Sequence, residues 1–144
     1  MIVCGVDISG NEAIISLLKF EDDIFHLPPC RTTRIACVDP DKNEDLKLFQ
    51  KTFAKLAEDY KIDHVVIRAR MKKGKFAGGA NGFKLEGVLQ VTPNLNVSIM
   101  KPTEQKENLK KYPLPLTFNE TGLKKYQEPA FMAAFAYIAG QYEW

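Results

Sequence analysis

Residues 2–18 read IVCGVDISGNEAIISLL and show the clearest strand pattern of the chain. Two apolar runs rich in strand-forming residues, 2–8 and 13–18, flank the turn Ser9-Gly10-Asn11. Glycine and asparagine tolerate the positive φ angles that tight hairpin turns require. The stretch therefore predicts a tight antiparallel hairpin.

A third strand is expected to follow the hairpin. It should lie within residues 31–38, after the break that Pro28-Pro29 imposes on the chain. Residues 24–27 either extend the second strand or form a loop. Together the three strands would form an antiparallel meander.

A helix and a buried strand come next. Apolar side chains at helical spacing predict a helix that ends near Tyr60, with Asn43 or Asp41 as its cap. The short apolar run 64–67 is typical of a strand buried on both faces.

The second half of the chain predicts three more helices and one more strand. A short helix covers residues 83–90, and a strand covers residues 97–100. A polar helix opens at residues 103–106 and ends before Pro113, and a last helix has Pro129 in its first turn.

This order of elements predicts an α/β fold with a mixed five-stranded sheet. The antiparallel three-strand meander precedes βαβ units, and helices cover both faces of the sheet. The strand at residues 64–67 should lie parallel and adjacent to the first strand. A chain of 144 residues fits one domain, residues 1–144.

The composition excludes several classes of protein. Apolar residues make up 45% and charged residues 26%, which is unlike a disordered or fibrous chain. The apolar run 129–139 is shorter than the roughly 20 residues that span a bilayer, and residues 1–10 lack the pattern of a signal peptide. We therefore expect a cytoplasmic protein without a membrane partner. The cysteines have no metal-binding spacing and are interpreted as reduced thiols: Cys4, Cys30 and Cys37.

The net charge of +2 is unevenly distributed. Residues 1–60 are acidic on balance and residues 61–144 are basic. The segment 64–85 contains no acidic residue, and clustered cations of this kind attract anions. Phe76 and Phe83 could stack on bases there. The candidate nucleic-acid or phosphate contacts in this segment are Arg68, Arg70, Lys72, Lys73, Lys75 and Lys84. The alternative is a solvated loop whose phenylalanines turn inward.

The hairpin with Val6-Asp7-Ile8-Ser9-Gly10 resembles the start of the ribonuclease H-like superfamily, and the order of elements resembles its RuvC-type Holliday-junction resolvases. The whole chain, from Cys4-Gly5-Val6-Asp7 through residues 10–15, is most similar to the bacterial domain of unknown function 3010 family. The superfamily's nucleases hold two divalent metal ions with three or four carboxylates, and these flank the scissile phosphate.

The resemblance assigns this carboxylate set only in part. Asp7 matches the carboxylate of the first strand, and Glu128, before an alanine-rich helix, matches an acid of the last helix. Both are candidate catalytic residues, and Asp7 is the candidate metal ligand if there is one. The acid expected at the end of the strand 64–67 is replaced by Arg68, which cannot bind a metal ion. We expect Arg68 to pair with Asp7, while contact with substrate phosphate is the alternative.

Three functions remain open at this point. The first is a domain that binds nucleic acid or a phosphorylated ligand, has lost metal-dependent cleavage and needs no cofactor. The second is a working Mg²⁺- or Mn²⁺-dependent nuclease that uses Asp7 and Glu128 with Glu86 or Glu120. The third is a non-enzymatic scaffold. A homodimer is compatible with each of them.

Overall fold

The computed structural model describes residues 1–74 and 78–141. The predicted hairpin forms at its start: β1 (Ile2–Ser9) and β2 (Glu12–Glu21) pair antiparallel over the full length of β1. Gly10, in the turn between them, has a φ of 59°, which a glycine adopts without strain. Asp7 lies opposite Ile14 near the turn end of the pair.

Two short strands, rather than the single third strand that the sequence predicts, pair with the outer edge of β2. Strand β3 (Ile24–His26) turns back and pairs with the far end of β2, and β4 (Arg34–Ala36) pairs with its near end. Residues 24–27 therefore neither extend β2 nor form only a loop. Pro28 and Pro29 lie between β3 and β4 and separate the two strands, because proline lacks the backbone N–H that pairing with a neighbouring strand requires.

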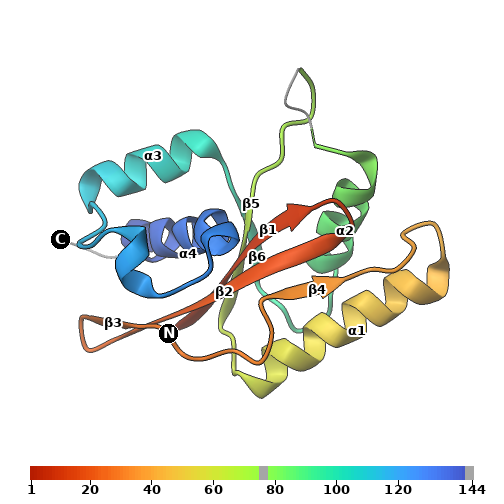
Figure 1. The fold of residues 1–144 in the computed structure, drawn as a ribbon, viewed down its shortest axis with the longest axis horizontal. Coiled ribbons are helices and arrows are strands. Elements are labelled where there is room, and N and C mark those ends of the chain that lie inside the picture. The colour runs from red at the N-terminus through yellow and green to blue at the C-terminus, as the bar shows by residue number, and fades with distance from the viewer. Residues whose placement is uncertain (75–77, 142–144) are drawn as a thin grey trace.

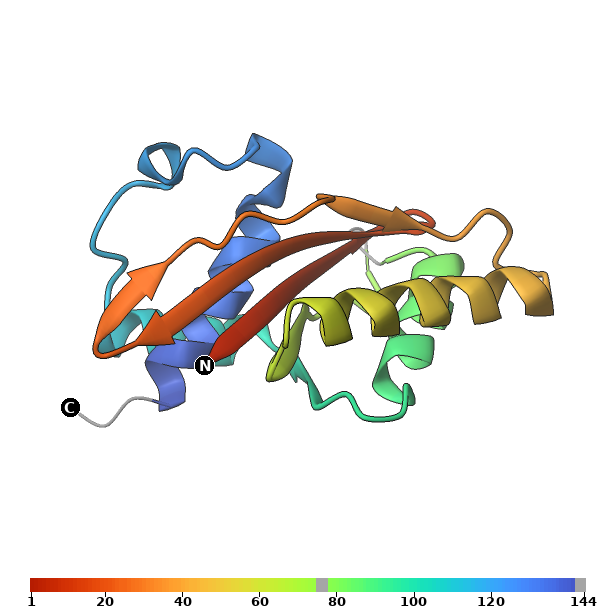
Figure 2. The same ribbon diagram turned by 90° about the horizontal axis from the view of Figure 1, so that it is seen from below.

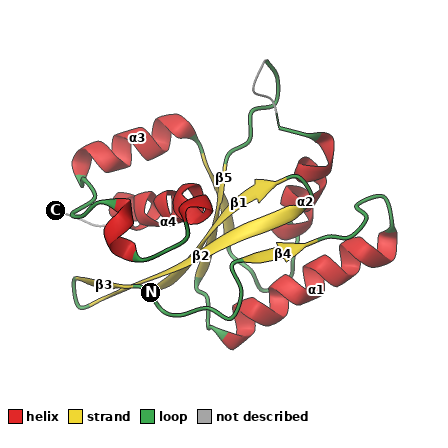
Figure 3. Cartoon of the chain, viewed as in Figure 1, coloured by secondary structure: helices red, strands yellow, loops and turns green. Residues whose placement is uncertain are grey.

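The parallel half of the sheet follows the prediction. Strand β5 (His64–Arg68) pairs parallel with β1, and β6 (Val97–Met100) pairs parallel with β5. The sheet order is β3-β2-β1-β5-β6. Strand β4 lies beside β2, as Figure 3 shows. The strand at residues 64–67 is thus adjacent and parallel to the first strand, as expected.

Helices cover both faces of this sheet (Figure 1). One face packs against α1 (Asn43–Asp59) and α2 (Ala80–Gln90), and the other packs against α3 (Pro102–Lys111) and α4 (Glu128–Gln141). Two short 3₁₀ helices, η1 (Phe118–Thr121) and η2 (Lys125–Gln127), precede α4. Figure 2 shows the two helix pairs separated by the twisted β1–β2 hairpin.

Two helix starts differ from the sequence-based expectation. Lys42 caps α1 without a side-chain hydrogen bond, so neither Asn43 nor Asp41 is its cap. Helix α2 begins at Ala80, three residues earlier than expected, and contains Gly82 within its first turn. Glycine is a poor helix former, so the earlier start reflects packing rather than intrinsic propensity.

Gly5 fixes how closely α4 lies on the centre of the sheet. A Cβ atom built on Gly5 would stand 1.8 Å from the carbonyl oxygen of Ala130 and 3.1 Å from the Cβ of Ala134. Gln127 holds the start of the helix, because its side-chain N–H donates to the carbonyl of Ile15 at 2.8 Å. The alanine-rich face of α4 and the glycine in β1 therefore position the helix directly beside the strand that carries Asp7.

The remaining sequence-based expectations concern thiols and membranes. All three cysteines are free, with Cys4 and Cys37 buried and Cys30 half-buried. In the described part of the chain, none of the helices combines the length and the apolar character that a membrane-spanning segment needs.

Candidate nucleic-acid interface at the carboxyl ends of β1 and β5

Asp7 and Arg68 lie next to each other at the carboxyl ends of two central strands. Val6 is in register with Ile67, so the next residue on each strand is also a neighbour. Side chains alternate along a strand, and Val66 packs on the α3–α4 face, which places Arg68 on that face together with Asp7. The Arg68 Nη1 atom is 3.7 Å from Oδ1 of Asp7. The structure confirms the predicted pair.

The two partners differ in their exposure to solvent. The Asp7 side chain is 19% exposed, whereas the Arg68 side chain is 53% exposed. Burial raises the pKa of Asp7 above its ordinary value, and the nearby charges of Arg68 and Arg70 counter this rise only in part. Arg68 thus partly offsets the burial of the Asp7 carboxylate, while about half of its own side chain faces solvent.

Arg70 is held within the fold. Its guanidinium donates to the carbonyl of Ile8 and lies 5.3 Å from the ring centre of Phe83. Glycines make room for it: a Cβ on Gly78 or Gly82 would come within 2.7 Å or 2.4 Å of its side-chain atoms. Arg70 therefore joins the end of β1 to the first turn of α2.

Glu86, which the nuclease alternative offered as a partner of Asp7 and Glu128 without support from a motif, is a buried acid of α2. Its side chain lies on the inner face of α2, and Oε2 has no hydrogen-bond partner within the described residues. Burial raises the pKa of Glu86, and the charges of Arg70 and Lys72 oppose the rise. In the sequence, the only indication of a role for Glu86 was its position as an acid on the apolar face of the predicted helix 83–90, directly after the glycines. That signal alone does not say which strand end the acid faces.

The other predicted cations have different surroundings. Lys72 and Lys73 are exposed, whereas Lys84 forms an ion pair with Asp41 at 2.6 Å. The ring of Phe83 lies against Arg70. Lys75 and Phe76 lie outside the described residues. Within the described part of the predicted basic surface, the solvent-facing cations are therefore Arg68, Lys72, Lys73 and Lys84, of which Lys84 is paired with Asp41.

The carboxylates do not assemble into a metal site in the described residues. Glu128 is exposed at the start of α4, and Glu120 lies in η1, where its Oε1 accepts from the Thr117 hydroxyl at 3.1 Å. Glu86 belongs to a helix on the opposite face of the sheet from α4. Across residues 1–74 and 78–141, no three acidic, histidine or cysteine side chains come together to hold a metal ion. The donor set present there does not fit a pair of Mg²⁺ ions.

Two small depressions adjoin the ion pair. One has a volume of about 170 Å³ and is lined by Asp7, Ile8, residues 68–71 and Gly78. The other has a volume of about 330 Å³ and lies between Arg68 and α3. Arg68 lines both, so a ligand in either depression would meet its side chain.

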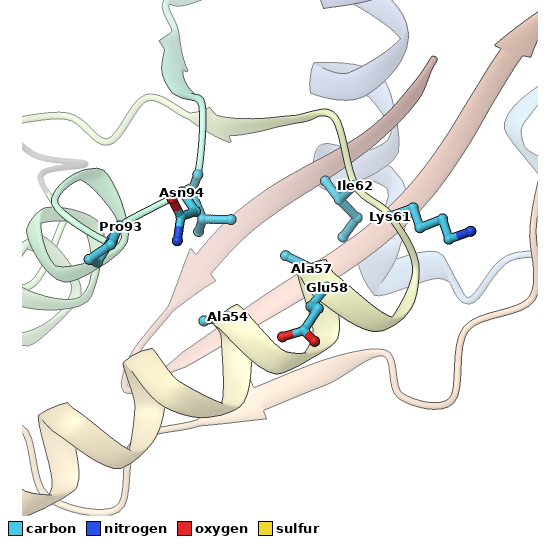
Figure 4. Close-up of a pocket in the computed structure, with 8 residues that line it drawn as sticks. Ala54, Ala57, Glu58, Lys61, Ile62, Pro93 and Asn94 are labelled. Carbon is cyan, nitrogen blue, oxygen red and sulfur yellow. The ribbon is translucent and has the colours of Figure 1, made fainter.

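A further pocket, of about 450 Å³, lies at the opposite end of the sheet, between the last turn of α1 and the loop before β6 (Figure 4). Its walls include Ala54, Ala57 and Pro93, with Glu58 and Lys61 as the charged residues. In Figure 4 the Lys61 side chain extends away from the other labelled residues. One acid and one lysine that points outward give this pocket no recognisable chemistry.

Comparison of the whole chain with solved structures identifies its fold. RuvC of Thermus thermophilus has a TM-score of 0.72 at 13% identity, over 98% of this chain and 95% of that one. The same protein in complex with Holliday junction substrate has a TM-score of 0.71 at 14% identity, over 98% and 95%. The fowlpox virus resolvase in complex with Holliday junction DNA has a TM-score of 0.54 at 15% identity, over 99% and 100%. Identities this low establish the ribonuclease H-like fold alone.

Sequence comparison gives the family. No curated protein matches the chain significantly. The family model described as "Protein of unknown function (DUF3010)" matches residues 1–137, nearly the whole chain. The chain therefore belongs to the DUF3010 family and has the ribonuclease H-like fold of RuvC.

Proposed function

We propose that this protein binds nucleic acid at the carboxyl ends of β1 and β5 and does not cleave it with metal ions. The observation that carries the proposal is the Asp7–Arg68 pair at 3.7 Å. A cation stands where the resemblance to resolvases leads one to expect a third metal-binding carboxylate. The same cation is half exposed and is therefore accessible to a phosphate group.

The surroundings of Arg68 support phosphate binding. Arginine recognises phosphate through paired N–H donors, and the exposed Lys72 and Lys73 follow it on the same chain segment. Neutralised phosphates release counterions, so a cluster of this kind binds nucleic acid in a salt-dependent way. The structural neighbours RuvC and the fowlpox virus resolvase have been solved with Holliday junction DNA, which makes branched DNA the first substrate to test.

The nuclease alternative has less support. It needs Asp7 and Glu128 to share metal ions with Glu86 or Glu120, and the described residues contain no such cluster. The scaffold alternative predicts no affinity for nucleic acid at all. Binding and cleavage assays on the same preparation therefore separate the three functions.

The test uses a fluorescently labelled four-way junction and a linear duplex at low salt, with and without Mg²⁺ or Mn²⁺. The wild type should bind without cleaving, and Arg68→Gln should weaken binding. Arg31→Gln is the matched control, because it removes an exposed arginine that pairs with Asp59 away from this site. Cleavage that is lost in Asp7→Asn would favour the nuclease, and absence of binding would favour the scaffold.

A further inference from the structure

A groove beside α3 adjoins the Asp7–Arg68 pair. We call it the α3 groove and define it by its six lining residues, which come from the ends of β5 and β6 and from α3: Arg68, Met100, Pro102, Gln105, Lys106 and Leu109. Its volume of about 330 Å³ is at the lower end of the range for small-molecule sites. The groove could not be predicted from the sequence, because its walls are far apart along the chain.

The lining of the α3 groove has the mixed character of a nucleotide site. Met100 is almost fully buried, and with Pro102 and Leu109 it offers an apolar surface to the face of a base. The Gln105 amide can both donate and accept hydrogen bonds, as the edge of a base requires. Arg68 and Lys106 carry the charge, and among the described residues no acid lines the groove; Glu104 and Glu107 occur on the same helix outside it.

The position of Arg68 links the groove to the proposed interface. Its side chain borders both the α3 groove and the smaller depression at Asp7. A phosphate held by Arg68 would therefore have a neighbouring nucleotide at the mouth of the α3 groove. A base that is stacked and paired inside a duplex cannot enter a groove, whereas an unpaired base can.

We infer that the α3 groove binds one unpaired nucleotide, so that the protein prefers single-stranded or unpaired segments over continuous duplex. This inference rests on the proposed function and names its substrate class. Arg68 and Lys106 hold the phosphates on either side of the nucleotide. Met100, Pro102 and Leu109 cover one face of the base.

The experiment compares a 10-nucleotide oligothymidylate with a blunt 10-base-pair duplex by fluorescence anisotropy at fixed low salt. Lys106→Gln removes a groove cation, and Lys110→Gln removes an exposed lysine of α3 that does not line the groove. Gln105→Trp fills the groove, and Thr103→Trp places the same side chain on an exposed position of the helix. Melting temperatures of all four variants report whether they are folded.

The inference predicts tighter binding of the oligothymidylate than of the duplex by the wild type. Lys106→Gln and Gln105→Trp should each weaken oligothymidylate binding by at least about fivefold, as for one lost charged contact, with little effect on the duplex. If both variants behave like their controls, or if the wild type prefers the duplex, the inference is overturned and the proposed function stands. If the wild type binds neither probe, the proposed function fails and the inference fails with it.

Discussion

Asp7 and Arg68 illustrate how exposure decides the energy of an ion pair. Removing one member of a fully buried pair typically costs about 3–5 kcal/mol, whereas an exposed pair contributes about 0–1 kcal/mol. With Arg68 half exposed and 3.7 Å from the carboxylate, this pair belongs near the exposed limit. The Asp7–Arg68 pair therefore contributes little to the stability of the fold. It matters because Arg68 places a positive charge at the carboxyl ends of the central strands.

Reversing that charge should have a measurable effect on stability. Arg68→Glu would place two carboxylates side by side on adjacent strands, and we expect it to lower the free energy of unfolding by about 1–2 kcal/mol. Arg68→Gln, which removes the charge without reversing it, should cost less. Urea denaturation at neutral pH and low salt measures both. Equal stabilities of the two variants would mean that Arg68 does not interact with Asp7 in solution.

Glu86 should make stability depend on pH. Burial raises its pKa above the ordinary 4.5, so the folded state holds this proton more tightly than the unfolded chain does. The stability that the neutral acid provides is complete below pH 4.5 and is lost as the pH rises through the higher pKa of the folded state.

Glu86→Gln should remove the part of the pH dependence of stability that comes from ionisation of Glu86. The free energy of unfolding of the wild type should fall relative to that of Glu86→Gln as the pH rises from about 4.5 toward neutrality. Glu104→Gln, on the exposed side of α3, controls for the change in net charge. Thermal unfolding at a series of pH values provides the curves. Parallel curves for the wild type and Glu86→Gln would show that the folded state does not raise the pKa of Glu86.

At the scale of residues, the sequence predicted some contacts of the candidate site and missed others. Placing Asp7 beside Arg68 required only the strand order and the alternation of side chains, and both were predictable. The contacts of Arg70 and Lys84 were not, because Arg70 packs against the first turn of α2 and Lys84 pairs with Asp41 at the surface. A run of cations along a sequence does not state which of them face solvent.

At the scale of elements, the contact of α4 with β1 controls the geometry of the candidate site. Gly5 has no side chain, and the helix uses that space: the carbonyl of Ala130 would collide with any Cβ there. Asp7 is two residues further along the same strand and on the same face. A change in the position of α4 should therefore alter the surroundings of this carboxylate.

A single methyl group tests this contact. Gly5→Ala should lower the free energy of unfolding by about 3 kcal/mol, near the upper end of the typical range for overpacking, because α4 must move to accommodate the methyl group. Gly87→Ala is the matched control: it lies in α2 with open space around its Cβ position, and alanine favours helices. It should be neutral or stabilising by up to about 1 kcal/mol. Guanidinium unfolding of both variants measures the difference, and comparable stabilities would contradict the close packing of α4.

The elements themselves were largely predictable from hydrophobic periodicity and turn residues. The β1–β2 hairpin, the parallel pairing of β5 with β1 and the helices on both faces occur as expected. The presence of two short strands, β3 and β4, in place of one third strand was not predicted, because a strand of three residues has too little periodicity to be recognised. The early start of α2 was missed because Arg70 packing on Gly82 outweighs the low helix propensity of glycine.

At the scale of the whole molecule, the ribonuclease H-like fold of this chain has an arginine beside a carboxylate at its central strand ends. Within the described residues, Arg68 and the dispersed acids leave no cluster for a metal pair. Titration calorimetry with Mn²⁺ should therefore show no pair of tight sites on the wild type. Two-site binding that disappears in Asp7→Asn would contradict this prediction and restore the nuclease alternative.

The claim that nucleic acid binds at the surface formed by Arg68, Lys72 and Lys73 is tested by the salt dependence of DNA binding. The logarithm of the association constant for duplex DNA falls with the logarithm of salt concentration, with a slope of about −0.9 per phosphate contact. The claim predicts salt-dependent binding by the wild type, and a slope about 1.8 units shallower for the double variant Lys72→Ala/Lys73→Ala. Lys47→Ala/Lys51→Ala, which removes two exposed lysines of α1, should leave the slope unchanged. Equal slopes for the two double variants, or no binding by the wild type at low salt, would contradict the claim.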